Sequence, residues 1–262
     1  MKKLTMYQVD AFASDIFKGN PAAVCPLDKW LSDEQMLSIA KENNLSETAF
    51  VVSENDGFRI RWFTPNEEIA LCGHATLATA HVLFDQMRYS SNEIKFYSQS
   101  GELNVRKLEK TLIMDFPALS YTPIESMNSF ESLNLKMPVK VFKSSFDLLF
   151  VYDSELDVIN AEPDLRAVAK LDYRGLILTA PGSKSDVFSR CFYPGCDVPE
   201  DPVTGSAHCV LAPYWCERFG KNRIKAKQGG RRQGDLICAV NGNRVLLEGS
   251  CHLYLKGTIY LP

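Results

Sequence analysis

Two short segments of this sequence place charged or polar side chains beside a glycine at the expected start of a helix. Residues 66–76 contain Glu67-Glu68 followed by Cys72-Gly73-His74-Ala75-Thr76, and residues 200–207 contain Asp201-Pro202-Val203-Thr204-Gly205-Ser206-Ala207. Helix N-termini present unpaired N–H groups and a partial positive charge, and glycine lets a ligand approach the backbone. Two such starts could bind a small anionic substrate and stabilise negative charge that develops on it. Two core helices that bind nothing would account for these residues equally well.

One further carboxylate stands where proton transfer is chemically reasonable. Glu47 lies at a predicted helix-to-strand junction, immediately before the apolar run that contains Ala49-Phe50-Val51. Partial burial at such a position would suit the side chain to act as an acid or base. A surface glutamate is the commoner interpretation of such a junction, and spacing alone does not decide between the two.

The two helix starts belong to a longer internal similarity. Arg61-Trp62-Phe63-Thr64-Pro65 is similar to Arg190-Cys191-Phe192-Tyr193-Pro194, and Gln99-Ser100-Gly101 is similar to Gln228-Gly229-Gly230. The members of each pair lie about half of the 262-residue length apart. We interpret this as a duplication that produced two similar lobes facing each other across a cleft. Two unrelated halves that share common strand and helix-start patterns are the alternative.

Strand-like segments dominate the elements that must position these residues. Helices are predicted at residues 32–43, 73–87, 163–171 and 204–219, and Pro213 is expected to bend or divide the last of them. The predicted fold class is α+β, with two pseudo-symmetric lobes, each a curved and mostly antiparallel sheet around one central helix. The N-terminal lobe is expected at 1–118, with a C-terminal strand at about 252–262 as a candidate to complete it. The C-terminal lobe is expected at 119–251.

Composition excludes several classes of function. The chain is 45% hydrophobic and 23% charged, with a net charge of −3 and a pI of about 5.9, so no nucleic-acid partner is expected. No apolar run suits a signal peptide or a membrane span, so a cytoplasmic protein is expected. The 8 cysteines form no CxxC pair, and no GxGxxG or P-loop motif occurs. We therefore expect neither a metal nor a nucleotide cofactor.

Six ordered blocks of this sequence resemble the PhzF family of phenazine-biosynthesis-like isomerases. The blocks are Tyr7-Gln8-Val9-Asp10-Ala11-Phe12, Phe17-Lys18-Gly19-Asn20-Pro21-Ala22-Ala23-Val24, Leu45-Ser46-Glu47-Thr48-Ala49-Phe50, Arg61-Trp62-Phe63-Thr64-Pro65, Cys72-Gly73-His74-Ala75-Thr76 and Asp201-Pro202-Val203-Thr204-Gly205-Ser206-Ala207-His208. The resemblance runs from the N-terminus to about residue 234 and is least informative over residues 125–172. It implies the diaminopimelate-epimerase-like fold, with the active site in the cleft between the two lobes.

The resemblance also implies an activity and the residues that carry it. It implies a cofactor-independent isomerase that shifts a proton between carbons of a small carboxylated metabolite, and a homodimer. By this resemblance Glu47 is the general acid/base, His74 and Asp201 orient the substrate and tune protonation, and Ser206 holds carboxylate or enolate charge. The substrate-binding positions that it implies are Gly73, Ala75, Thr76, Gly205 and Ala207. The substrate itself does not follow from family membership.

Two alternative functions and the role of one loop stay open at this point. A non-catalytic binding or interaction protein could have kept the same pocket, although such a role requires none of the acid/base residues. An amino-acid or hydroxy-acid epimerase of the two-thiol kind would use Cys72, because a cysteine at a helix N-terminus is activated. The segment 202–204 offers no second thiol, so we expect Cys72 to be a buried structural residue. The glycine-rich segment 228–234 is either a loop that places an arginine near an anionic substrate or a plain surface hairpin.

Overall fold

The computed structural model describes residues 2–125 and 128–261 and divides into two compact units. Unit 1 comprises Met1–Asp115 together with Glu248–Pro262, and unit 2 comprises Phe116–Leu247. The predicted lobe boundaries, 1–118 and 119–251, stay a prediction. No helix in the described part of the chain is both long and apolar enough to cross a membrane.

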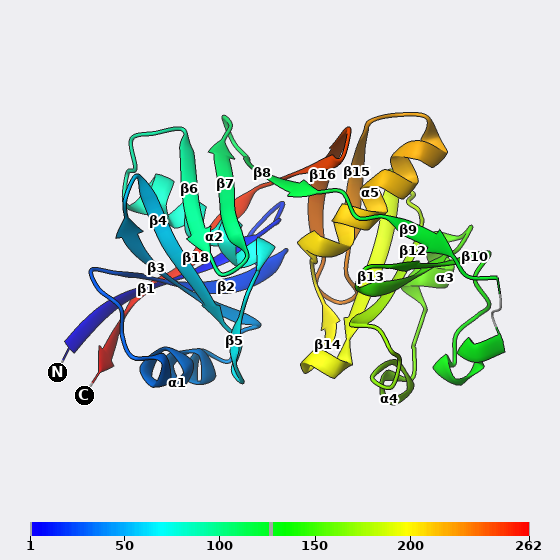
Figure 1. Ribbon diagram of the computed structural model, residues 1–262, viewed down its shortest axis with the longest axis horizontal. Helices are drawn as coiled ribbons and strands as arrows, with labels where there is room; N and C mark the ends of the chain where they lie inside the picture. The colour runs from blue at the N-terminus through cyan, green and yellow to red at the C-terminus, as the bar shows by residue number, and fades with distance from the viewer. Residues whose placement is uncertain (1, 126–127, 262) are drawn as a thin grey trace. The chain divides into compact units, whose positions relative to one another are not determined.

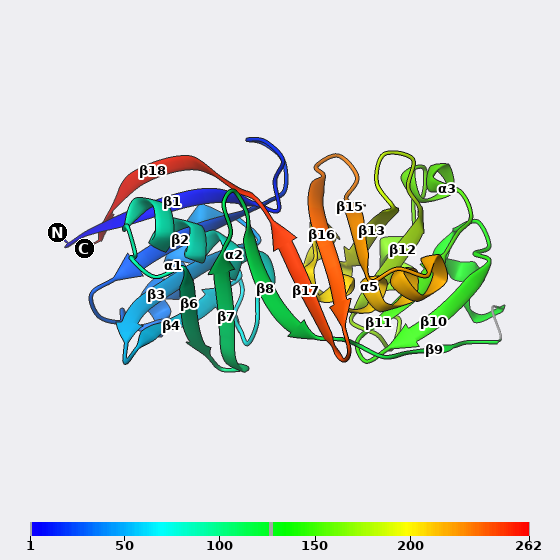
Figure 2. The same cartoon turned by 90° about the horizontal axis from the view of Figure 1, so that it is seen from above.

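Unit 1 is a curved sheet that covers one buried helix (Figure 1). Its elements are β1 (Lys2–Ala11), β2 (Asn20–Leu27), α1 (Asp33–Asn43), β3 (Glu47–Glu54), β4 (Gly57–Phe63), β5 (Glu68–Ile69), α2 (Gly73–His81), the π-helical turn η1 (Val82–Gln86), β6 (Glu93–Ser98), β7 (Gly101–Lys107), β8 (Leu112–Pro117) and β18 (Cys251–Leu261). β1 lies between β18 and β2 and is antiparallel to both, whereas β2 and β3 are parallel. Figure 2 shows β1 and β18 side by side along their length. α2 packs against β1, β2 and β3, and seven of its nine residues are buried.

Unit 2 has the same architecture. Its elements are β9 (Tyr121–Pro123), η2 (Asn128–Leu133), β10 (Lys140–Ser144), β11 (Asp147–Val151), α3 (Glu155–Ile159), α4 (Leu165–Val168), β12 (Gly175–Pro181), β13 (Val187–Tyr193), η3 (Pro194–Cys196), β14 (Val198–Asp201), α5 (Gly205–Phe219), β15 (Arg223–Gln228), β16 (Gly234–Asn241) and β17 (Arg244–Gly249). α5 packs against β15 and β16, and ten of its residues are buried.

The same succession of strand pairings occurs in both units. In unit 1 a parallel pair (β2–β3) is followed by antiparallel β3–β4 and β4–β5 and then by parallel β4–β6. In unit 2 the parallel pair β11–β12 is followed by antiparallel β12–β13 and β13–β14 and then by parallel β13–β15. The predicted α+β fold class is therefore confirmed, and the internal similarity of the sequence is present as a repeat of topology.

An ion pair recurs at the matching place in each unit. Arg61 Nε donates to Glu68 Oε1 at 2.7 Å, linking β4 to β5, and Arg190 Nε donates to Glu200 Oε1 at 2.7 Å, linking β13 to β14. Both arginines make bidentate contacts with their glutamate, a geometry that gives direction as well as energy. Each pair supports the short strand that leads to the central helix, which explains why the arginine blocks were among the similar segments.

Two of the predicted helices have other bounds in the structure, and a third begins where it was expected. α2 ends at His81 and continues as the π-turn η1, not as an α-helix to residue 87. The helix predicted over 163–171 is limited to α4, and its start is fixed by the Asp164 side chain, which accepts hydrogen bonds from the backbone of Arg166 and Ala167. α1 begins as expected, with Ser32 and Gln35 forming a capping box.

Pro213 does not divide α5, which runs unbroken from Gly205 to Phe219. Proline cannot donate the helical hydrogen bond to the carbonyl four residues earlier, which here belongs to Cys209. The backbone N–H of Leu119 donates to the Cys209 carbonyl instead, at 2.9 Å. The segment that leads into β9 thus satisfies the acceptor that the proline leaves behind.

Candidate active site

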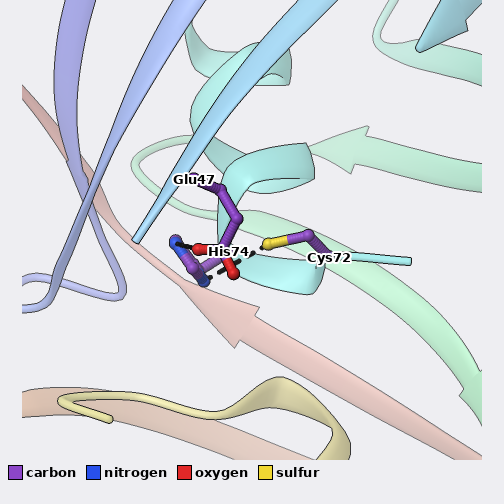
Figure 3. Close-up of side chains that lie close together, drawn as sticks. All are labelled: Glu47, Cys72 and His74. Atoms are coloured by element: carbon purple, nitrogen blue, oxygen red, sulfur yellow. Dashed lines mark hydrogen bonds and ion pairs between the residues drawn. The ribbon is translucent and has the colours of Figure 1, made fainter. Parts of the chain in front are cut away.

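Three side chains of unit 1 converge at the start of α2 (Figure 3). Glu47 is the first residue of β3, Cys72 is the N-cap residue of α2, and His74 is the second residue of that helix. Glu47 Oε2 lies 3.0 Å from His74 Nε2, and Cys72 Sγ lies 3.5 Å from His74 Nδ1. The strand and the helix therefore bring together two of the four predicted acid/base residues.

The two ring nitrogens of His74 face different partners. Nε2 faces Glu47, whereas Nδ1 faces both Cys72 and the side-chain amide of Asn20, whose Nδ2 is 3.3 Å away. Asn20 is the first residue of β2, which runs parallel to β3 and places Ala22 opposite Glu47. The order of these strands therefore puts the asparagine and the glutamate on opposite sides of the same imidazole.

The contact between Glu47 and His74 is close but not aligned as a hydrogen bond. Both Glu47 Oε2 and His74 Nε2 are buried, and neither has an aligned hydrogen-bond partner in the described part of the chain. Buried polar atoms in native proteins are nearly always paired, and an unmet pairing costs about 1–3 kcal/mol. These two atoms are therefore suited to bind a polar group or a transferable proton of a ligand.

Burial and neighbouring charges shift the pKa values of His74 and Cys72. Burial lowers the pKa of His74, but Cys72 and the Glu47 carboxylate raise it, and the net pKa lies well above the usual 6.5. Burial, and after it the Glu47 charge, raise the pKa of Cys72 above 9.0. Cys72 is consequently a thiol at neutral pH, so we assign the upward shift of the His74 pKa to the Glu47 carboxylate. The activated thiolate that a two-thiol epimerase would need is not what this environment favours.

The same three residues form the one group, among the described residues, whose side-chain atoms could converge on a metal ion. Their possible ligand atoms all lie within 4.8 Å of one another. Glu47 and Cys72, however, face opposite nitrogens of the His74 ring, an arrangement that suits hydrogen bonding better than shared coordination. The expectation of a reaction without a metal stays a prediction.

In unit 2 a second polar group surrounds Asp201, the last residue of β14. Thr204 Oγ1 donates to Asp201 Oδ2 at 2.5 Å. Gln228, at the end of β15, is fully buried and donates to the Asp201 carbonyl and to Thr204 Oγ1, both at 2.9 Å. The backbone N–H of Thr204 donates to Gln228 Oε1 at 3.0 Å. Asp201 is therefore held by a network that ties it to the start of α5.

The remaining predicted site residues occupy the first turns of the two central helices. Ser206 is the second residue of α5, as His74 is of α2, and it is half-buried. The predicted substrate-binding residues lie in the same turns: Gly73, Ala75 and Thr76 in α2, and Gly205 and Ala207 in α5.

Thr76 and His208 occupy matching places in the first turns of the two helices and make matching contacts. Thr76 Oγ1 donates to the Cys72 carbonyl at 2.6 Å. His208 Nδ1 donates to the Thr204 carbonyl at 2.9 Å. Each side chain bonds the carbonyl of its own helix's N-cap residue. His208 is fully buried, as expected for a core residue.

Sequence reasoning did not single out Asn20, Thr204 or Gln228 as contributors to the site. All three stood within segments noted for other reasons: the block 17–24, the block 201–208 and the glycine-rich segment 228–234. The signal that was available is their position beside glycine or proline at the end of a strand, where side chains meet at an edge of the sheet. The prediction that Glu47, His74, Asp201 and Ser206 serve one site stays a prediction.

The fold alone already defines a class of protein. Despite only 8% sequence identity, the chain superposes with a TM-score of 0.63 on the crystal structure of a probable proline racemase of Agrobacterium radiobacter, covering 99% of this chain and 93% of that one. The molecule therefore has the diaminopimelate-epimerase-like fold of two repeated units.

The sequence then narrows the class to a family. The profile of the phenazine biosynthesis-like protein family, PhzC-PhzF, matches residues 9–257, and the chain belongs to this family. It is 49% identical to an "uncharacterized isomerase" of Pseudomonas aeruginosa over 99% of this chain and all of that one. The crystal structure of a PhzF-family protein from Enterococcus faecalis superposes with a TM-score of 0.95 and 45% identity, over 99% of this chain and 100% of that chain. The family predicted from the six blocks is confirmed.

Proposed function

We propose that this protein is an isomerase that shifts a proton between two carbons of a small carboxylated metabolite, with Glu47 as the general acid/base. The isomerase class is that of the full-length relative in Pseudomonas aeruginosa. The observation that supports the role of Glu47 is its 3.0 Å approach to His74, with both facing atoms buried and lacking an aligned partner in the described structure. A carboxylate in such a position is able to accept a proton from a ligand and to return it.

The proposed reaction needs no oxidant or further reactant. Glu47 takes a proton from a carbon next to an activating group, and the electron pair of the broken C–H bond is delocalised into the adjacent π system. The same carboxyl group then returns the proton to another carbon of that system, which leaves an isomer of the substrate. His74, Asp201 and Ser206 are the proposed helpers, which orient the substrate and stabilise the charge that develops. One base acting on one face suits a shift of a double bond better than an inversion, which needs groups on both faces.

Unit 2 offers a specific argument against a two-thiol epimerase. The N-cap residue of α5 is Thr204, at the place that Cys72 occupies before α2. A hydroxyl group at this position is a far weaker base than a thiolate. The observation therefore favours the single-base proton shift over an inversion carried out by two thiols.

The test is proton NMR in D2O with a panel of small unsaturated carboxylates, including dihydro-hydroxyanthranilate-type acids. We expect wild type to incorporate deuterium or to move a double bond in at least one of these compounds. Glu47→Gln should lose this activity by at least about 10³-fold, because it removes the proton acceptor while keeping the shape of the side chain. The matched control is Glu54→Gln, at the other end of β3, whose carboxylate pairs with Arg59.

The possible outcomes separate the competing functions. Unchanged exchange in Glu47→Gln would show that this residue is not the base. Saturable binding without exchange in any compound would favour a binding protein. Rapid exchange of a proton at a stereogenic carbon together with inversion would favour an epimerase.

Two further properties are part of the proposal. We expect a homodimer that acts on a small anionic substrate and that resides in the cytoplasm. Light scattering at micromolar concentration tests the oligomeric state, and cell fractionation tests the location.

A further inference from the structure

In both units the residue at the N-cap of the central helix does not cap that helix with its side chain. Cys72 precedes α2 and Thr204 precedes α5, and both have extended backbone, with φ −143° and ψ 111° for the first and φ −117° and ψ 104° for the second. Neither side chain accepts a hydrogen bond from the first turn of its helix. Threonine at an N-cap ordinarily makes this bond, which contributes about 1 kcal/mol to stability. The Thr204 hydroxyl therefore bonds a group other than the backbone of its own helix.

Each of these side chains instead contacts the acid/base residue predicted in its own unit. Thr204 Oγ1 is 2.5 Å from Asp201 Oδ2, and Cys72 Sγ is 3.5 Å from His74 Nδ1. The two contacts begin at matching N-cap residues, but the contacted residues do not match, because His74 lies in the first turn of α2 whereas Asp201 ends the strand before α5. They are chemically different, because one joins a hydroxyl to a carboxylate and the other joins a thiol to an imidazole.

The direction of the Thr204 hydroxyl is determined by Gln228. The Gln228 amide nitrogen donates both to Thr204 Oγ1 and to the Asp201 carbonyl, while its oxygen accepts from the Thr204 backbone. These contacts agree with only one orientation of the amide, since a reversed amide would place its oxygen against the Asp201 carbonyl and its NH2 group against the Thr204 backbone N–H. Because Thr204 Oγ1 accepts a hydrogen from Gln228, its own hydrogen is directed to Asp201.

We propose that Thr204 is a positioning residue for Asp201, that Gln228 sets the direction of the Thr204 hydroxyl, and that Cys72 is a positioning residue for His74 in unit 1. The inference rests on the proposed function, because it gives these side chains a purpose through Asp201 and His74. An oriented hydroxyl donor favours the ionised carboxylate and restricts its rotation, since hydrogen bonds to a charged acceptor are the stronger kind. The thiol makes only weak hydrogen bonds, as donor or as acceptor, and lies at a longer distance, so Cys72 should contribute less than Thr204.

The kinetic test compares Thr204→Val, which keeps the shape and loses the hydroxyl, with Thr204→Ser, which keeps the hydroxyl. On a substrate found in the D2O panel, Thr204→Val should lower kcat about 10–100-fold, with KM changed less than about threefold. The acidic limb of its pH–rate profile should move to higher pH. Thr204→Ser should restore kcat to within about threefold of wild type and return the acidic limb to its place.

Gln228 and Cys72 are tested by the same profile. Gln228→Glu keeps the acceptor for the Thr204 backbone but removes the donor to its hydroxyl, so it should move the acidic limb in the same direction as Thr204→Val. Cys72→Ala should lower kcat less than Thr204→Val does. The matched control is Thr79→Val, which removes a buried hydroxyl that donates to the Ala75 carbonyl of its own helix and should leave kcat and the pH profile unchanged.

A crystal structure separates failure of this inference from failure of the proposed function. If the inference holds, the Asp201 carboxylate moves to another rotamer in Thr204→Val and stays in place in Thr204→Ser, with or without a substrate. An unmoved carboxylate in both variants overturns the inference, as does a Thr204→Val enzyme with wild-type kcat and pH profile. A fully active Glu47→Gln variant overturns the proposed function and not the arrangement around Asp201.

Discussion

Glu47 and His74 meet at 3.0 Å although one begins a strand and the other lies in the first turn of a helix, with β4 and β5 between them in the chain. The contact exists because β3 packs against α2 and because the short strand β5 returns the chain to the start of that helix. The Glu47 carboxylate at this distance raises the pKa of His74, so a change at Glu47 alters the protonation of the imidazole.

This coupling predicts a pH dependence of stability. The pKa of His74 is raised in the folded protein, so the stabilisation by the Glu47–His74 pair is fully present below about pH 6.5 and is lost as the pH rises through the raised pKa. The difference in free energy of unfolding between wild type and Glu47→Gln should therefore shrink as the pH rises above about 6.5. Urea titrations across this range measure the difference. A difference that grows with rising pH would contradict the assignment.

In unit 2, His208 is expected to make the protein less stable as the pH falls, the opposite direction to that expected for the Glu47–His74 pair. Burial lowers its pKa to about 4, although the bond from Nδ1 to the Thr204 carbonyl raises it slightly in return. Below about pH 6.5 the His208 side chain is protonated in the unfolded chain but stays neutral in the folded unit until about pH 4. The free energy of unfolding should therefore fall by about 3 kcal/mol between pH 6.5 and pH 4 through His208. His208→Gln should lose this part of the acid sensitivity in urea titrations. Parallel stability curves for wild type and variant would show that His208 does not titrate in this way.

Replacing Pro213 is expected to change the free energy of unfolding less than replacing an interior helix proline usually does. An interior proline destabilises a helix by about 3 kcal/mol, in part because an acceptor loses its partner. The Cys209 carbonyl already accepts from Leu119. Pro213→Ala should therefore raise the free energy of unfolding by less than about 1 kcal/mol. A gain near 3 kcal/mol in urea unfolding would mean that the Leu119 bond does not compensate.

We expect only one cysteine of the chain to react rapidly with an alkylating agent. Cys196 is exposed, while burial raises the pKa of every other thiol in the chain. Iodoacetamide at pH 7 should modify Cys196 first, and the product should keep its isomerase activity. Peptide mass spectrometry identifies the modified residue, and Cys196→Ser provides the control without a fast phase. Rapid inactivation that Cys72→Ser prevents would restore the thiol mechanism.

The fold was largely predictable because the signals that define it are local and repeated. The arginine blocks at 61–65 and 190–194 lie on matching strands, and the glycine-led segments at 73 and 205 begin the two central helices. Both signals depend on residue type within a few positions of the element they mark. The confirmed family adds the order of the six blocks to these local signals.

What the sequence could not provide depends on contacts between distant segments. Asn20 reaches His74 only because β2 lies beside β3, and Gln228 reaches Thr204 only because β15 ends beside the start of α5. Pro213 was expected to bend or divide its helix because no local feature reveals that Leu119 supplies the missing donor. Side-chain hydrogen bonds of this kind follow from tertiary pairing and leave no periodic pattern.

The pairing of β1 with β18 has a consequence for how the molecule is made. β1 bonds to β18 from Lys2 to Ala11, and the whole of unit 2 lies between these strands in the chain. During synthesis unit 2 is therefore complete on the nascent chain before unit 1 receives its last strand. The half that carries Glu47 and His74, although translated first, can complete its sheet only after all of unit 2 has been translated.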